Sequence, residues 1–101
     1  MKTSELKSLA LEWAVAKCEN KPLYGNLVVG YKFSTDWAQG GPIIEREKIS
    51  LQAIDDRWDA VKTIMPFVAK YGPTPLEAAM RCYVASKLGD EIEIPEAFCK
   101  W

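Results

Sequence analysis

The segment 72-GPTPLEAAMRCYVASKLGDE-91 carries both the start and the stop signals of a helix, and it constrains the fold more than any other part of the chain. Thr74 can cap this helix, Pro75 suits its first position, and Glu77 completes a capping box. Gly89 stands where a left-handed C-cap is expected. A broad apolar face follows at helical spacing, formed by Leu76, Ala79, Met80, Tyr83, Val84 and Leu88. The segment therefore predicts a long helix that packs against the core.

A second helix is predicted near the N-terminus, where Thr3 or Ser4 can cap a helix that runs to about Cys18. Its polar side chains fall on one narrow stripe, formed by Glu5, Ser8, Glu12 and Glu19. Apolar side chains cover most of the remaining circumference, so we expect this helix to lie against a sheet or another helix.

Strand patterns occupy the middle and the end of the chain. The residues from Leu27 to Phe33 predict a short strand, and 49-ISLQAI-54 and 57-RWDAVKTI-64 alternate apolar and polar residues around a turn at Asp55 and Asp56. The segment 91-EIEIP-95 predicts a last short strand. This order predicts one compact α+β domain over residues 1–101, with two main helices and a short helix packed on a small, mostly antiparallel sheet.

Composition excludes several classes of function. The chain has 13 basic and 14 acidic residues spread over 101 positions, with no basic run of the kind that sequence-independent nucleic-acid binding requires. It has no stretch approaching ~20 apolar residues and no signal-peptide pattern, so we expect a cytoplasmic protein without a membrane span. The absence of histidine removes Ser-His and Cys-His nucleophiles and the commonest transition-metal ligand. We therefore predict no metal, no cofactor and no catalytic residue.

The three cysteines, Cys18, Cys82 and Cys99, form no short CxxC spacing. In a cytoplasmic protein this pattern is typical of buried thiols on helices.

The least ordinary segment is 34-STDWAQGGPIIERE-47, and two interpretations of it are open. In a purely structural interpretation it is a wide loop with a glycine hinge. Trp37 then enters the core, and Pro42 opens a short helix that Ile43 and Ile44 anchor.

In a functional interpretation the same segment binds a ligand. Gly40 and Gly41 would leave backbone N–H groups uncovered at the positive end of the short helix, where an anion can bind. Trp37 offers a flat face for a planar ring, and Asp36 and Gln39 can bind hydroxyls or base edges. Arg81, otherwise an i, i+4 partner of Glu77, is a further candidate. The predicted site for a small anionic, nucleotide-like molecule comprises Ser34, Thr35, Asp36, Trp37, Gln39, Gly40, Gly41 and Arg81.

Two other functions stay open. A protein-interaction module would use exposed apolar residues, for which the candidates are Phe67, Tyr71, Phe98 and Trp101. A small hydrolase could use Asp36 with Glu45 or Glu47 as acid and base. Because pockets of the predicted kind often form between subunits, a chain this small with four Trp residues is also a candidate homo-oligomer.

Three segments together resemble the NinX-like family of small proteins that tailed bacteriophages and prophages encode. They are 8-SLALEWAVAKCE-19, 34-STDWAQGGPIIEREKISL-51 and 72-GPTPLEAAMRCYVASKLGDEIEIP-95. The resemblance implies a phage accessory protein that acts in the bacterial cytoplasm, but it implies no reaction and supplies no catalytic residue. Several phage anti-defence proteins of this size hold a nucleotide immune signal without cleaving it. By analogy, a chain without histidine suits such sequestration better than hydrolysis.

Overall fold

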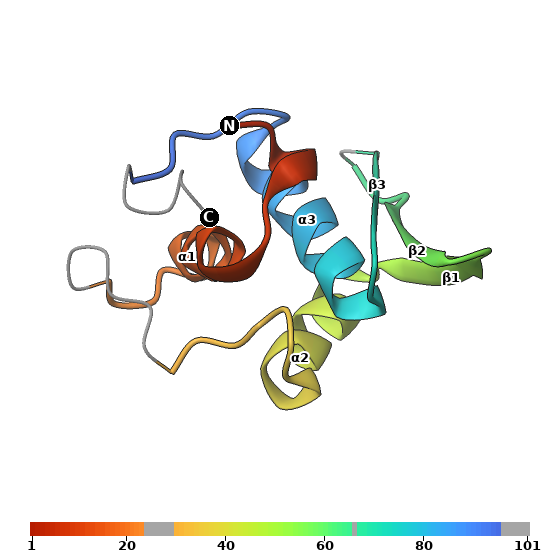
Figure 1. Ribbon diagram of the computed structural model, residues 1–101, viewed down its shortest axis with the longest axis horizontal. Helices are drawn as coiled ribbons and strands as arrows, with labels where there is room; N and C mark the ends of the chain where they lie inside the picture. The colour runs from red at the N-terminus through yellow and green to blue at the C-terminus, as the bar shows by residue number, and fades with distance from the viewer. Residues whose placement is uncertain (24–29, 66, 96–101) are drawn as a thin grey trace.

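The computed structural model describes residues 1–23, 30–65 and 67–95, and it confirms the α+β class (Figure 1). A short 3-10 turn, η1 (Thr3–Glu5), precedes helices α1 (Ser8–Cys18) and α2 (Trp37–Glu47). Three strands follow, β1 (Ser50–Ile54), β2 (Arg57–Lys62) and β3 (Val68–Gly72), and the last helix is α3 (Pro75–Leu88). Helix α3 runs through the middle of the molecule, with α1 on one side and the sheet on the other.

The sheet is antiparallel throughout, in the order β1-β2-β3. The predicted hairpin is confirmed, because β1 and β2 pair around the two-residue turn Asp55-Asp56. Strand β3 was not predicted, since it lies in a segment without a recognisable alternation. Alternate residues of the strands face α3, and Ala60 at the centre of that inner face is fully buried.

Helix α3 begins and ends where predicted. Thr74 Oγ1 accepts a hydrogen bond from the N–H of Glu77 at 3.1 Å. Gly89 follows the helix with a positive φ of +87°, but its ψ of −168° differs from the left-handed helical cap that was predicted. The predicted surface pair of Glu77 with Arg81 is wrong, because Arg81 is only 9% exposed. Its guanidinium donates instead to the carbonyl of Leu6 at 2.7 Å and to that of Tyr71 at 2.9 Å. Arg81 therefore ties η1 and β3 to α3.

The first helix begins later than predicted, at Ser8. Thr3 does not cap it, because this residue is fully buried and both its N–H and its Oγ1 donate to the carbonyl of Asp90, at 2.8 and 3.2 Å. The strand predicted over 91–95 is reduced to a single isolated bridge, in which Glu91 pairs with Lys2. We call these contacts between residues 1–3 and 90–92 the terminal clasp.

The strand predicted over Leu27–Phe33 falls partly outside the described residues. In the part that the structure describes, residues 30–33 form no strand, since Gly30 has φ of +87° and turns the chain. Phe33 is buried against the core and its ring stacks with that of Tyr31.

Candidate functional site

Helix α2 begins at Trp37, five residues before the predicted start at Pro42. Asp36 caps it, with Oδ1 accepting from the N–H of Ala38 at 2.9 Å. Gly40 and Gly41 therefore lie inside the helix, and the N–H of Gly40 donates to the carbonyl of Asp36 at 2.9 Å. The expectation that both glycines leave uncovered N–H groups ahead of a helix is wrong for this reason.

Close packing explains why a glycine stands inside α2. A Cβ on Gly40 would lie 2.3 Å from the carbonyl oxygen of Phe33 and 2.7 Å from Cδ2 of Leu76. Trp37 is 53% exposed, so the structural interpretation that placed it in the core is wrong. The indole lies on the surface at the first residue of α2.

Ser34 anchors the segment that leads into α2. Its N–H and Oγ both donate to the carboxylate of Glu12, at 3.2 and 2.5 Å, and both residues are buried. Burial raises the pKa of Glu12, although the hydrogen bonds from Ser34 oppose this shift and Glu77 adds to it. Glu12 thus lies inside the molecule rather than on the polar stripe that helical spacing predicted for α1.

Four of the eight predicted binding residues line two hollows. Ser34, Thr35 and Trp37 line a hollow of about 260 Å³, the Trp37 hollow, together with the first residues of α3. Gln39 lines a larger one of about 560 Å³, the α2 hollow. Thr35 also lines a third hollow, of about 430 Å³. The other four predicted residues line neither the Trp37 hollow nor the α2 hollow; they are Asp36, Gly40, Gly41 and Arg81. The full lining of the α2 hollow is Glu19, Lys21, Gly30, Tyr31, Phe33, Ala38, Gln39, Pro42, Ile43 and Arg46.

One wall of the α2 hollow is aromatic and held in place by hydrogen bonds. The rings of Tyr31 and Phe33 stack, with centroids 5.6 Å apart and planes 17° from parallel. Tyr31 donates its hydroxyl to the carbonyl of Pro22 at 2.7 Å. The Gln39 amide accepts from the N–H of Lys32 at 2.8 Å and donates to the carbonyl of Gly30 at 3.0 Å. Gln39 therefore positions this wall.

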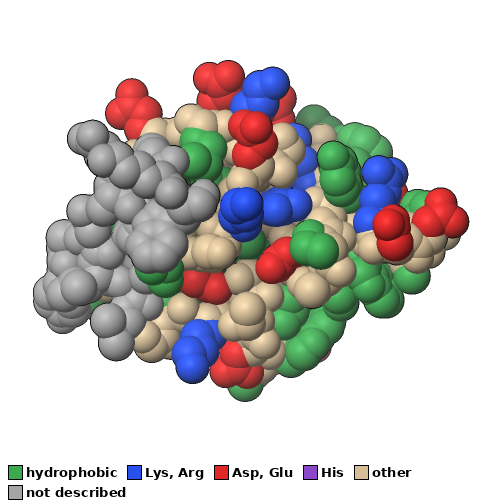
Figure 2. Space-filling view, in the orientation of Figure 1, with side chains coloured by type: hydrophobic (Ala, Val, Ile, Leu, Met, Phe, Trp, Pro, Cys, Tyr) green, Lys and Arg blue, Asp and Glu red, His purple; other side chains and the backbone are tan. Residues whose placement is uncertain are grey.

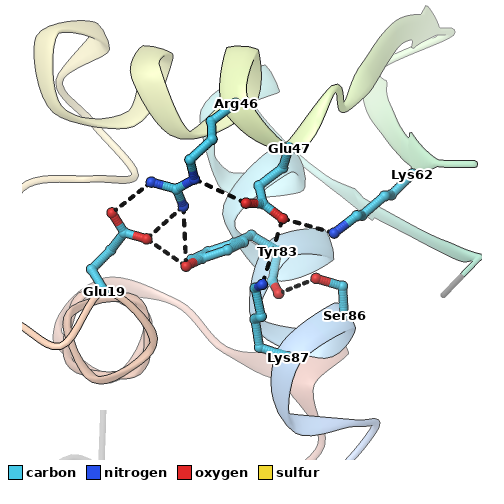
Figure 3. Close-up of polar contacts among 7 residues, drawn as sticks. All are labelled: Glu19, Arg46, Glu47, Lys62, Tyr83, Ser86 and Lys87. Atoms are coloured by element: carbon cyan, nitrogen blue, oxygen red, sulfur yellow. Dashed lines mark hydrogen bonds and ion pairs between the residues drawn. The ribbon is translucent and has the colours of Figure 1, made fainter. Parts of the chain in front are cut away.

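Two residues that line the hollow, Glu19 and Arg46, also belong to an ionic cluster that joins α1, α2, β2 and α3, formed by Glu19, Arg46, Glu47, Lys62, Tyr83 and Lys87 (Figure 3). Arg46 binds both oxygens of Glu19, at 3.1 and 2.6 Å, and its Nε donates to Glu47 at 2.9 Å. Tyr83 donates its hydroxyl to Glu19 and accepts from Arg46. Three cations thus meet two carboxylates in a cluster that shares Glu19 and Arg46 with the hollow.

Glu47 is held by cations from two other elements. Lys62, buried at the end of β2, contacts it at 2.7 Å, and Lys87 of α3 lies at 3.8 Å. Burial alone would raise the pKa of Glu47, but the bonds from Lys62 and Arg46 outweigh it and leave that pKa below its usual value.

Glu19 is also ionised at neutral pH. The Arg46 guanidinium lowers the pKa of this carboxyl against the effect of its burial, and Tyr83 lowers it further. Burial and the bond to Glu19 raise the pKa of Tyr83, so its hydroxyl stays protonated and donates.

The carboxylates proposed for hydrolysis do not meet. Asp36 caps the start of α2, while Glu45 and Glu47 lie in its last turn, about 14–16 Å away along a helix that rises ~1.5 Å per residue. Asp36 bonds the helix start and Glu47 is paired with Lys62. These residues cannot act as acid and base on one bond.

No group of three or more His, Cys, Asp or Glu side chains in the described part of the chain could hold a metal ion. None of the helices described combines the length and the apolar character needed to cross a membrane. Cys18 is half-buried and Cys82 is buried, both as free thiols, while Cys99 lies outside the described residues. Charges of both signs mix over the face drawn in Figure 2, and hydrophobic side chains gather on the side where the sheet lies.

Several residues of the α2 hollow were not predicted, notably Glu19, Lys21, Tyr31 and Arg46. Glu19, Lys21 and Tyr31 lie outside the segment 34–47, and Arg46 lies near its end. No spacing rule relates these four residues to one another. The sequence carried one signal for Arg46. It follows the apolar pair Ile43-Ile44, and its spacing of three residues from Ile43 places both side chains on the same side of α2.

Comparison with known proteins identifies one family. The model of the family described as "Bacteriophage P22, NinX" matches residues 2–87, which include every residue of the α2 hollow and of the ionic cluster. No curated protein matches the chain.

Proposed function

The chain belongs to the bacteriophage P22 NinX family, and from this premise we propose that it sequesters a small anionic, nucleotide-like molecule without changing it chemically. Family membership makes it a phage accessory protein. The ligand and the sequestration are our proposal, and a signal of host defence is the class of molecule that a phage gains most from removing.

One observation carries the proposal: the α2 hollow combines a suitable volume with the two kinds of surface that a nucleotide needs. Its volume of about 560 Å³ lies within the range of roughly 300–1,000 Å³ that is usual for small-molecule sites. The stacked rings of Tyr31 and Phe33 supply an aromatic wall for a planar group. Lys21 and Arg46 supply positive charge at the hollow's lining.

Arg46 retains hydrogen-bonding capacity for an anion. A guanidinium has five N–H groups, and the contacts to Glu19, Glu47 and Tyr83 engage Nε, Nη2 and one hydrogen of Nη1. One Nη1 hydrogen is left, and the Arg46 side chain is 50% exposed. A phosphate could accept this bond together with one from Lys21. It would compete with Glu19 for the Arg46 N–H groups that Glu19 now binds.

Binding without catalysis fits the chemistry of the lining. Tyr83 keeps its proton, and Glu19 and Glu47 are engaged by cations, so the hollow presents no free general base among these residues. A molecule held there would therefore be released unchanged.

A thermal-shift panel of mono-, di- and cyclic nucleotides tests the proposal. We expect at least one compound to raise the melting temperature, and mass spectrometry of the released ligand to recover it intact. A panel without any stabilising compound, or recovery of a cleaved product, would contradict it.

Two variants then locate the site. Lys21→Gln removes an exposed charge at the α2 hollow and should weaken binding, whereas Lys17→Gln removes another exposed charge, on α1 outside that hollow, and should not. Trp37→Ala tests the smaller hollow. Loss of binding in Trp37→Ala with full binding in Lys21→Gln would move the site to the Trp37 hollow and refute our assignment.

A second candidate function, a protein-interaction module, is favoured by exposed apolar side chains after β2. Met65 is 86% exposed and Phe67 67%, and Ile64 and Tyr71 are also more than half exposed. Phe98 and Trp101, the other residues predicted for this surface, lie outside the described residues. In a pull-down from infected cells, a stoichiometric partner that Phe67→Ser loses and Lys21→Gln retains would support this function.

A further inference from the structure

The two edges of the sheet differ in how their backbone groups are used. Strand β2 is central, so β1 and β3 each have one side without a neighbouring strand in the described chain. At the β3 edge, the carbonyl of Tyr71 accepts from Arg81 at 2.9 Å, and Lys70 places a charge on the strand. Arg81 and Lys70 thereby protect this edge against pairing with another strand.

Strand β1 has none of these protections. Its sequence, SLQAI, has no charged residue and no proline, and it pairs with β2 residue for residue without a bulge. A strand edge of this kind presents a row of free backbone donors and acceptors to any chain that can pair with it.

The hairpin geometry tells which residues of β1 present those groups. A two-residue turn makes Ile54 and Arg57 a hydrogen-bonded pair, and the alternation of an antiparallel ladder repeats this at Gln52 with Asp59. The backbone groups of Leu51 and Ala53 therefore point away from β2, to the free edge.

We propose that β1 pairs antiparallel with β1 of a second copy of this chain, about a two-fold axis at Gln52, to form a continuous six-stranded sheet. An antiparallel pair of identical strands is self-complementary about a two-fold axis, as the interface of a symmetric dimer requires. In this register Leu51 exchanges hydrogen bonds with the partner's Ala53, and Ala53 with the partner's Leu51. All four outward-pointing N–H and C=O pairs are then used.

Charges at the two ends of β1 favour a second copy as the occupant. Exposed Lys48 precedes the strand, and exposed Asp55 and Asp56 follow it. The antiparallel arrangement brings the end of β1 that follows Lys48 next to the partner's turn Asp55-Asp56, so opposite charges lie near each other at both ends of the interface. Between these ends, Ser50 faces the partner's Ile54 and Gln52 faces the partner's Gln52, so no like charges oppose each other.

Substitution of Gln52 by residues of opposite charge tests the proposal. Sedimentation equilibrium should find a dimer for the natural chain. Gln52→Lys and Gln52→Glu each place like charges opposite one another at the axis and should each weaken dimerisation about fivefold or more. An equimolar mixture of the two variants should restore a dimer that contains one copy of each.

A control variant and circular dichroism keep the test decisive. Ala69→Lys adds the same charge at the exposed β3 edge and should leave the dimer unchanged. Circular dichroism spectra that match the natural chain show that each variant is folded. A natural chain that stays monomeric up to millimolar concentration overturns the proposal, and so does a mixture of variants that fails to associate.

Discussion

The consecutive glycines of α2 should respond very differently to the same substitution. Gly40→Ala should destabilise the protein, whereas Gly41→Ala should change its stability little. Both residues lie in the helix, but they meet different surroundings. A Cβ on Gly40 would lie 2.3 Å from the carbonyl oxygen of Phe33, whereas a Cβ on Gly41 would meet Cε3 of Trp37 at an ordinary 3.9 Å.

The magnitudes follow from these distances. At Gly40 the close neighbour is backbone, which cannot rotate aside, and Leu76 adds a second overlap at 2.7 Å. Overpacking of this kind costs about 1–3 kcal/mol, of which the better helix propensity of alanine offsets about 0.5–1 kcal/mol. At Gly41 the gain of about 0.5–1 kcal/mol is opposed by Pro42, whose ring disfavours the helical conformation for a preceding residue that carries a Cβ, so we expect little net change.

Urea titration followed by Trp fluorescence measures both effects. We expect the midpoint to fall for Gly40→Ala and to stay nearly unchanged for Gly41→Ala, with the same slope m in both, because neither exposes new surface on unfolding. In thermal unfolding, each kcal/mol corresponds to about 4–8 °C for a domain of this size. Equal shifts in one direction would refute the view that close approach to Phe33 selects glycine at position 40.

Three further predictions concern α3, Glu12 and the thiols. Thr74→Ala removes the acceptor for the N–H of Glu77 and should lower the free energy of unfolding by about 1 kcal/mol in the same urea titration. Because the folded state raises the pKa of Glu12, its contribution to stability is greatest below the unfolded pKa and declines as the pH rises through the folded value. Glu12→Gln should remove this decline, and a pH series of unfolding free energies that keeps the decline would contradict the assignment. Burial raises the pKa of Cys18 and Cys82 to about 11, so each thiol should be alkylated at neutral pH about a hundredfold more slowly than in the unfolded chain, as peptide mass spectrometry can measure.

Elements with local signals were predictable from the sequence. Thr74, Pro75 and Gly89 mark the bounds of α3 through interactions within a few residues of each other, and the turn at Asp55-Asp56 does the same for the hairpin. Arg81 shows the limit of such reasoning. Its spacing from Glu77 indicates a surface pair, but its guanidinium instead donates to the carbonyls of Leu6 and Tyr71, which come from distant parts of the sequence.

Helix α2 was only partly predictable because its sequence conflicts with its structure. The run Gly40-Gly41-Pro42 is typical of a loop, and Pro42 removes the bond that the carbonyl of Ala38 would otherwise receive. Ala38 is exposed, so water can bond this carbonyl. The glycine that weakens the helix locally allows it to pack against Phe33, a gain that depends on tertiary structure alone.

The candidate site was predictable in its segment but not in its arrangement. Gln39 was predicted and lines the α2 hollow, but its hydrogen bonds to the backbone of Gly30 and Lys32, which no spacing encodes, place it there. Glu19, Arg46 and Tyr83 meet from three helical segments, and residue spacing does not encode that meeting.

The terminal clasp also determines when this protein can finish folding during its synthesis. Thr3 leaves the ribosome well before the carbonyl of Asp90 that satisfies its two donors is made, because 87 residues separate them in the sequence. The N–H of Ile92 likewise bonds the carbonyl of Met1 at 2.9 Å. A nascent chain that has not yet reached residue 90 must keep both donors of Thr3 hydrated. The clasp can therefore close only after residues 90–92 have been made.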